Sequence, residues 1–204
     1  MSHPHQPHGH DRHRNPRDLK DYLQRLEGSE RAAWQKPDEV IAALGVRAGD
    51  VAAEAGAGPG YFSLRLARAV GQEGHVFAAD VEPRMLEVLC ERIVAARIEN
   101  VTPILSLPGD PLLPPASCDL ALIVDTFHHF PDGAAYLRRL ARALKPGGRI
   151  VNIDFFEREL PVGPPPAHKL SREAFLRIAS EAGLALESEQ TFLPYQYFLV
   201  LRPR

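Results

Sequence analysis

The chain has 204 residues, of which 45% are apolar, so it is long enough to form one domain around a single core. Its 24 lysines and arginines nearly balance 26 aspartates and glutamates, which gives a formal net charge of −2. Domains that bind nucleic acids usually carry a marked basic excess, so this balance argues against a nucleic-acid partner.

Cysteine spacing and hydropathy argue against a metal-binding protein and a membrane protein. Cys90 and Cys118 show no CxxC spacing and cannot form a metal cluster by themselves, which fits a reduced, cytoplasmic protein without a metal site. No apolar run approaches the length of about 18 residues that spans a bilayer, and the polar N-terminus is unlike a signal peptide. We therefore expect no membrane association.

Histidines are concentrated at the N-terminus. Five of the nine lie in the run MSHPHQPHGHDRHR, at His3, His5, His8, His10 and His13. The intervening prolines oppose regular structure, so residues 1–16 are expected to be a disordered tail. Imidazoles at this spacing can also share a transition-metal ion, and metal binding is the alternative interpretation.

Residues 17–36 are expected to form a helical cap segment before the main domain at 37–204. Apolar residues between Leu19 and Leu26 follow the i, i+3, i+4, i+7 spacing of an amphipathic helix, which Gly28 ends. A second helix is expected from Pro37, a residue suited to the first helical turn, to Gly45.

Beyond residue 49, short apolar runs alternate with longer stretches of helical periodicity. The expected strands are 50–55, 75–80, 101–105, 118–124 and 149–155, and the expected helices between them are 61–70, 83–98 and 134–144. Near-continuous apolar strands separated by helices are typical of a parallel sheet covered on both faces. The sequence therefore predicts an α/β, doubly wound, Rossmann-like domain.

The C-terminal region departs from this alternation. After a helix expected at 171–182, the strand-like runs 186–192 and 197–201 are separated by only four residues. So short a connection joins antiparallel strands but not parallel ones, and the last strand is therefore expected to run against the sheet.

A glycine-rich turn follows the first expected strand, in the segment EAGAGPGYF at residues 54–62. Gly56, Gly58 and Gly60 allow a sharp turn and the close approach of a ligand, and the helix that follows offers unpaired amides. Asp80 stands twenty residues after Gly60, at the end of the second strand. An acidic side chain at this place accepts hydrogen bonds from ribose hydroxyls.

On these segments the chain resembles the class I S-adenosylmethionine-dependent methyltransferases of the small-molecule type, in the type 11 group that includes quinone-biosynthesis enzymes. VAAEAGAGPGYFSLRLA, VFAADVEPRML, CDLALIVDTFHHF and YLRRLARALKPGGRIV are similar to four successive family motifs. The resemblance covers roughly residues 37–201. It implies a seven-stranded, mostly parallel sheet with an antiparallel last strand, S-adenosylmethionine as cofactor, and methyl transfer to a small-molecule acceptor.

The resemblance also implies a set of cofactor-binding residues, with Asp80 holding the ribose. These are Glu54, Gly56, Ala57, Gly58, Gly60, Asp80, Val81, Met85, Asp110 and Asp125. Many members carry an Asp that binds the adenine amino group where this chain has Leu107, three residues before Asp110. Either Asp110 reaches the adenine, or backbone groups near Leu107 do so and Asp110 is a solvated turn residue.

Two other functions stay open. A nicotinamide-dependent oxidoreductase would use a similar turn and ribose acid, but its fingerprint is GxGxxG, and here the last glycine comes one residue early. A non-catalytic domain that binds S-adenosylmethionine as a sensor would show the same motifs.

Residues just past the fourth and fifth strands are candidates for the acceptor side: Asp125, Thr126, His128, His129 and Asp154. Asp125 and His128 are the catalytic candidates, since either side chain can act as a general base. Asp125 alternatively contacts the amino acid end of the cofactor, and the histidines alternatively pack under the next helix. His168 either closes over the site or is a solvated loop residue.

The acceptor is expected to be a small, partly apolar metabolite, bound by a monomer or homodimer. An arsenite acceptor would require several cysteines at the site, which Cys90 and Cys118 do not supply. Trp34 either clamps the N-terminal segment to the core or forms a lid over the ligands.

Overall fold

The computed structural model describes residue 23 and residues 28–204. The tail expected at 1–16 and nearly all of the amphipathic helix expected around Leu19 to Leu26 lie outside these residues.

Seven strands form one sheet in the order β3-β2-β1-β4-β5-β7-β6. β7 runs antiparallel to both of its neighbours, β5 and β6, and all other neighbouring strands pair in parallel. The expected seven-stranded sheet with an antiparallel last strand is confirmed. The strands are β1 (Val51–Ala55), β2 (His75–Asp80), β3 (Val101–Leu105), β4 (Cys118–Val124), β5 (Leu144–Phe155), β6 (Leu184–Gln190) and β7 (Gln196–Pro203).

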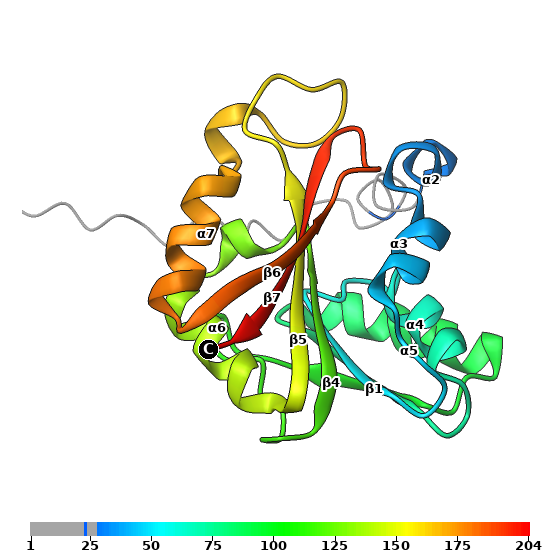
Figure 1. Ribbon diagram of the computed structural model, residues 1–204. Helices are drawn as coiled ribbons and strands as arrows, with labels where there is room; N and C mark the ends of the chain where they lie inside the picture. The colour runs from blue at the N-terminus through cyan, green and yellow to red at the C-terminus, as the bar shows by residue number, and fades with distance from the viewer. Residues whose placement is uncertain (1–22, 24–27) are drawn as a thin grey trace, which may run out of the picture.

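Helices cover both faces of the sheet, as the doubly wound prediction requires. Figure 1 shows α6 and α7 on one side and α3, α4 and α5 on the other. The helical elements are α2 (Ser29–Gln35), α3 (Pro37–Leu44), α4 (Ser63–Val70), α5 (Pro83–Ala96), the 3-10 turn η1 (Phe127–His129), α6 (Gly133–Ala143), the 3-10 turn η2 (Pro166–His168) and α7 (Arg172–Glu181).

The central strands are buried on both faces because successive side chains enter different cores. In β4, Leu120 and Leu122 join the cluster beneath α3 and α4, whereas Ala121 and Ile123 join the cluster beneath α6 and α7. All four are at most 1% exposed. Alternation between two apolar cores explains why these strands read as continuous apolar runs.

Some element boundaries differ from those expected. β5 begins at Leu144 and not at residue 149, because Leu144 already pairs with Cys118 across a register shift. α6 begins at Gly133 because the Asp132 carboxylate caps it, accepting a hydrogen bond from the Ala135 amide at 2.9 Å. Sequence periodicity locates such elements but does not fix their ends.

α2 lies at the carboxyl edge of the sheet, near the connection that leads into β7 (Figure 1). The Trp34 ring packs 5.5 Å from Phe155, at the end of β5, and 6.4 Å from Tyr195, just before β7. This contact is the clamp that one interpretation of Trp34 expected. Among the described residues, no helix has both the length and the apolar character needed to cross a bilayer.

Candidate active site

The glycine-rich turn connects β1 to α4 with three left-handed residues. Gly56, Gly58 and Gly60 have φ of +78°, +53° and +91°. A Cβ at Gly56 would lie 2.3 Å from Thr126, and one at Gly60 would lie 2.5 Å from Leu89, so neither position admits a side chain. Nothing lies within 4 Å of a Cβ built at Gly58, so the loop presents bare backbone to open space there.

Asp80 ends β2 beside this turn. Its Oδ2 accepts a hydrogen bond from the Gly58 amide at 2.7 Å, and its Oδ1 accepts one from the Glu82 amide at 2.9 Å. Burial raises the pKa of Asp80 against the opposing effect of these two amides. An ionised carboxylate has about four lone-pair sites, so two stay available for the hydroxyls of a ribose.

Glu54 lies beneath the turn and is 3% exposed. Its Oε2 accepts a hydrogen bond from the Ser63 hydroxyl at 2.5 Å. Burial raises the pKa of Glu54 to about 8, although Ser63 and Arg31 both oppose the shift. At neutral pH this carboxyl is therefore mostly protonated, and a cationic ligand group placed beside it would ionise it.

Asp125 follows β4 and has a left-handed backbone, with φ of +53°. Its carboxylate accepts hydrogen bonds from the side-chain amides of Gln196 at 2.6 Å and Gln35 at 3.0 Å. Burial and the nearby Asp154 raise the pKa of Asp125 to about 7. A non-glycine residue in this conformation, held by side chains of two other elements, is typical of a functional site.

Arg31 brings a buried positive charge from α2. Its side chain is 13% exposed, and its Nη2 lies 3.9 Å from Oδ2 of Asp125. Its guanidinium stacks 4.1 Å from the centre of the Tyr61 ring and also donates a hydrogen bond to Gln35. α2 is thus attached to the carboxyl edge by polar contacts as well as by Trp34.

Sequence reasoning missed Arg31, Gln35 and Gln196. The available signal was a glutamine in an apolar strand, since Gln196 stands in the run YQYFLV and is 1% exposed. A buried amide needs a polar partner, but the sequence alone does not say which.

His128 and Asp154 meet at the same edge. Nδ1 of His128, in η1, lies 3.2 Å from Oδ2 of Asp154, near the end of β5. Burial disfavours the imidazolium, but the hydrogen bond and charge of Asp154 outweigh this effect and raise the pKa of His128. The His129 ring lies beside that of His128, with the ring centres 4.1 Å apart.

The other candidates from the sequence lie between β3 and β4, in η2, on α5 and in the glycine turn. Asp110 accepts a hydrogen bond from the Leu112 amide at 2.9 Å and pairs with Arg139 of α6 at 3.2 Å. His168 is exposed in η2. Met85 and Ala57 are each 3% exposed, in α5 and the glycine turn.

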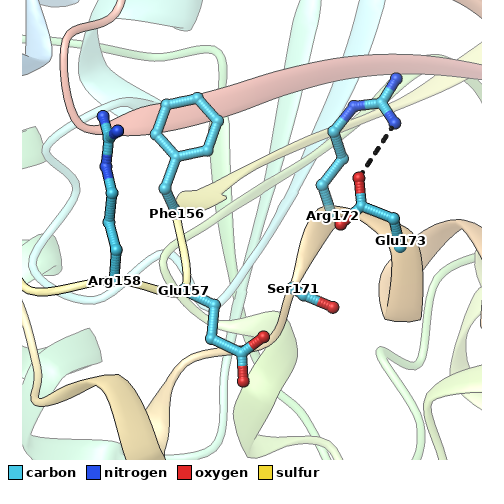
Figure 2. A pocket seen from close by; sticks show the side chains of 6 residues that line it. All are labelled: Phe156, Glu157, Arg158, Ser171, Arg172 and Glu173. Carbon is cyan, nitrogen blue, oxygen red and sulfur yellow. Dashed lines mark ion pairs between the residues drawn. The ribbon is translucent and has the colours of Figure 1, made fainter.

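A cavity of about 340 Å³ opens between the end of β5 and the start of α7 (Figure 2). It is lined by Phe156, Glu157, Arg158, Ser171, Arg172 and Glu173. Its two arginines and two glutamates balance in formal charge, and Arg172 forms ion pairs with Glu173 at 3.5 Å and with Glu189 at 2.6 Å. The cavity is therefore a mixed polar and aromatic hollow and not an anion site.

Comparison with known proteins shows what this chain is similar to. A sequence profile described as a methyltransferase domain matches residues 52–148. The crystal structure of a SAM-dependent methyltransferase from Aquifex aeolicus superimposes with a TM-score of 0.84 at 25% identity, over 89% of this chain and 96% of that chain. Residues 52–148 thus match a methyltransferase domain, and the fold is that of an S-adenosylmethionine-dependent methyltransferase. The nicotinamide-dependent alternative is not favoured by these likenesses.

The curated relatives that this chain matches include demethylmenaquinone methyltransferases. Demethylmenaquinone methyltransferase of Shouchella clausii is 30% identical over 134 residues, which are 64% of this chain and 54% of that protein. The Staphylococcus aureus protein of the same name is 34% identical over 132 residues, which are 63% of this chain and 52% of that protein. The chain thus spans about half the length of these relatives.

The residues at the carboxyl edge fit S-adenosylmethionine, the cofactor of this family. The bare backbone at Gly58 leaves room for a ligand, and Asp80 has free acceptor sites for a ribose. Glu54 and Asp125 are buried acids with raised pKa values, which suits a ligand that brings positive charge.

Proposed function

We propose that this chain transfers a methyl group from S-adenosylmethionine to a small-molecule acceptor by in-line displacement. One observation supports this proposal above others. The open backbone at Gly58, the ribose-type acid Asp80 and the buried acids Glu54 and Asp125 lie at one edge of the sheet. The candidate base His128 lies at the same edge, where β4 and β5 end. Open α/β sheets bind their ligands at this edge.

We assign the cofactor contacts as follows. Asp80 accepts from the ribose hydroxyls, and Val81 and Met85 follow it along the chain to pack on the adenine. Glu54 and Asp125 face the ammonium of the amino acid end, and Arg31 faces its carboxylate.

For the adenine amino group we favour backbone atoms near Leu107 over Asp110. The Asp110 carboxylate pairs with the Arg139 guanidinium of α6 at 3.2 Å, and its other oxygen closes the local turn by accepting a hydrogen bond from the Leu112 amide at 2.9 Å. This arrangement supports the interpretation of Asp110 as a turn residue.

Bound S-adenosylmethionine supplies a methyl group activated by its sulfonium. What the protein contributes is alignment of the acceptor and exclusion of water. α2 covers the edge through Trp34 and Gln35, which supports a role in excluding water. His128 is the candidate general base, because its Nδ1 is engaged by Asp154 while the ring lies at the acceptor side.

The names of the curated relatives support an acceptor of the quinol type. We further propose a cytoplasmic location and no nucleic-acid partner, which the near-neutral net charge and the two free cysteines support.

Calorimetric titration tests the cofactor assignment. We expect saturable heat with S-adenosylhomocysteine and none with NADH, and heat with NADH alone would instead support an oxidoreductase. Turnover is tested with S-adenosylmethionine carrying a labelled methyl group, incubated with a small-molecule extract. Binding of S-adenosylhomocysteine without any labelled product would favour a sensor over an enzyme.

A further inference from the structure

We propose that the ammonium of Lys169 binds a carboxylate of the methyl acceptor, so that the acceptor is a planar, conjugated acid that carries this carboxylate apart from the atom that is methylated. The inference rests on the proposed methyltransferase function and names the acceptor class of the same site. Lys169 determines specificity, and no step of methyl transfer passes through it.

Lys169 is a buried lysine with little to compensate its charge. It is 8% exposed, which is uncommon for a lysine. Its Nζ donates a hydrogen bond to the Arg158 carbonyl at 2.8 Å. An ammonium carries three N–H donors, and no carboxylate among the described residues pairs with this one. Donors thus remain for a ligand.

The positive charge itself is not explained by the fold. Burying a charge is costly unless an opposite charge and hydrogen bonds compensate it. One neutral carbonyl and the ring of Phe155, whose centre lies 5.7 Å from Nζ, compensate it only in part. An apolar side chain of similar length would pack on the same ring without that cost. An anionic group of a ligand accounts for the lysine.

The loop between β5 and α7 fixes the backbone of Lys169. The Lys169 amide donates to the Pro166 carbonyl at 3.0 Å, and the Tyr197 hydroxyl donates to the Leu170 carbonyl at 3.3 Å. Prolines occupy four of the six positions in 161–166, which restricts the backbone before the lysine. The ammonium is therefore held in place before a ligand arrives, and such preorganisation lowers the cost of binding.

Aromatic side chains lie beside the ammonium. Phe155 ends β5, and its ring lies 5.5 Å from that of Trp34, which is 6.4 Å from Tyr195. The loop packs closely here, because a Cβ at Gly163 would lie 2.7 Å from the Phe155 ring. Figure 1 shows this loop at the same end of the sheet as α2 and the start of β7. Aromatic rings at a ligand-binding edge suit a planar, conjugated acceptor.

A carboxylate matches this site better than a phosphate, because only one positive charge is directed to it. The Arg158 guanidinium lies over the Phe156 ring, 5.2 Å from its centre, as Figure 2 illustrates. Arg172 is paired with Glu189 at 2.6 Å. Phosphates carry up to two charges and are usually held by several donors. Lys169 alone supplies one charge.

The acceptor class is tested with S-adenosylmethionine carrying a radiolabelled methyl group, incubated with the protein and a small-molecule extract. Labelled products are run on an anion-exchange column before and after a carbodiimide couples their carboxylates to a neutral amine. We expect the main product to be retained before coupling and not after it. A neutral, cationic or methyl-ester product, or one retained after coupling, would overturn the inference and leave the methyltransferase function intact. No labelled product would overturn the function, and the inference with it.

The role of Lys169 is tested by calorimetric titration of the purified main acceptor and its carboxamide into the protein loaded with S-adenosylhomocysteine. The unaltered protein should bind the carboxylate about tenfold or more tightly than the carboxamide, because hydrogen bonds to a charged group are the stronger ones. Lys169→Met keeps an apolar stem against Phe155 and should bind both ligands equally, with S-adenosylhomocysteine affinity unchanged. A purely structural role would lower the melting temperature and leave the preference for the carboxylate in place.

Lys145→Met is the matched control. Lys145 also lies on β5, near its start, where it pairs with Asp119 at 2.7 Å. The change removes the same charge at the opposite end of the strand, so the preference for the carboxylate should equal that of the unaltered protein. Equal affinity of the unaltered protein for the carboxylate and the carboxamide would refute the site, even if the Lys169 variant does not fold.

Discussion

Asp80 shapes the glycine turn and also retains acceptor sites for a ligand. Replacing it with alanine removes the acceptor of the Gly58 amide and the proposed acceptor of two ribose hydroxyls. Hydrogen bonds to a charged group contribute about 1.5–3 kcal/mol, so Asp80→Ala should weaken S-adenosylhomocysteine binding by roughly that amount. Calorimetric titration of the variant measures the difference.

Asp110→Ala is the matched control for this change. Asp110 also ends in a carboxylate near the carboxyl edge, but this carboxylate forms an ion pair with Arg139 of α6 and closes a local turn at Leu112. Its affinity for S-adenosylhomocysteine should not change. An equal loss in the two variants would place Asp110 on the adenine, and no loss in Asp80→Ala would place the ribose elsewhere.

At the scale of elements, the parallel strands and their covering helices could be predicted because buried strands are continuous apolar runs and covering helices have apolar residues at helical spacing. The apolar run at 118–124 coincides with β4 (Cys118–Val124), and Asp80 ends β2 as expected. The hairpin before β7 followed from a connection too short for parallel strands. The spacing of apolar and polar residues along the chain was enough to predict β4, the end of β2 and the hairpin.

The polar attachment of α2 could not be predicted in this way. Gln35 and Gln196 lie 161 positions apart in the chain, and their side chains meet at 3.3 Å only after the sheet has formed. Asp154 likewise finds its partner on η1 and not on its own strand. Contacts between distant elements leave no period in the sequence, whereas strands and amphipathic helices do.

The Gln35 side chain is expected to hold α2 against the carboxyl edge of the sheet. Its amide donates to Asp125 at 3.0 Å, and it is fully buried. Gln35→Ala leaves buried polar groups of Asp125 and Gln196 without this partner, which costs about 1–3 kcal/mol. We expect faster hydrogen exchange of the amides in 29–36, while the exchange of β4 and β5 stays slow.

Glu30→Ala is the control for this helix. Glu30 is exposed on α2, so its removal should leave exchange in 29–36 nearly unchanged. Equal exchange in the Gln35 variant and the unaltered protein would show that Trp34 packing alone holds the helix.

For the whole molecule, the buried acids couple stability to pH. The pKa of Glu54 is about 8 in the folded chain against an ordinary value of 4.5, and that of Asp125 is about 7 against 3.8. At a pH between the ordinary and the folded pKa of each acid, the folded chain binds more protons than the unfolded chain. The free energy of unfolding without cofactor must therefore fall as pH rises from about 5 to 8.

Glu54→Gln isolates the larger part of this dependence. Glutamine keeps an oxygen that can accept the Ser63 hydrogen bond but does not ionise, so urea unfolding at pH 5.5 and 8 should show a smaller difference for the variant. The exposed Glu157→Gln change should retain the full difference.

S-adenosylhomocysteine should release about one proton on binding at pH 7, because its ammonium ionises the buried acids. Stability that rises between pH 5.5 and 8 in the unaltered protein would contradict the assignment of protonated carboxyls to this site.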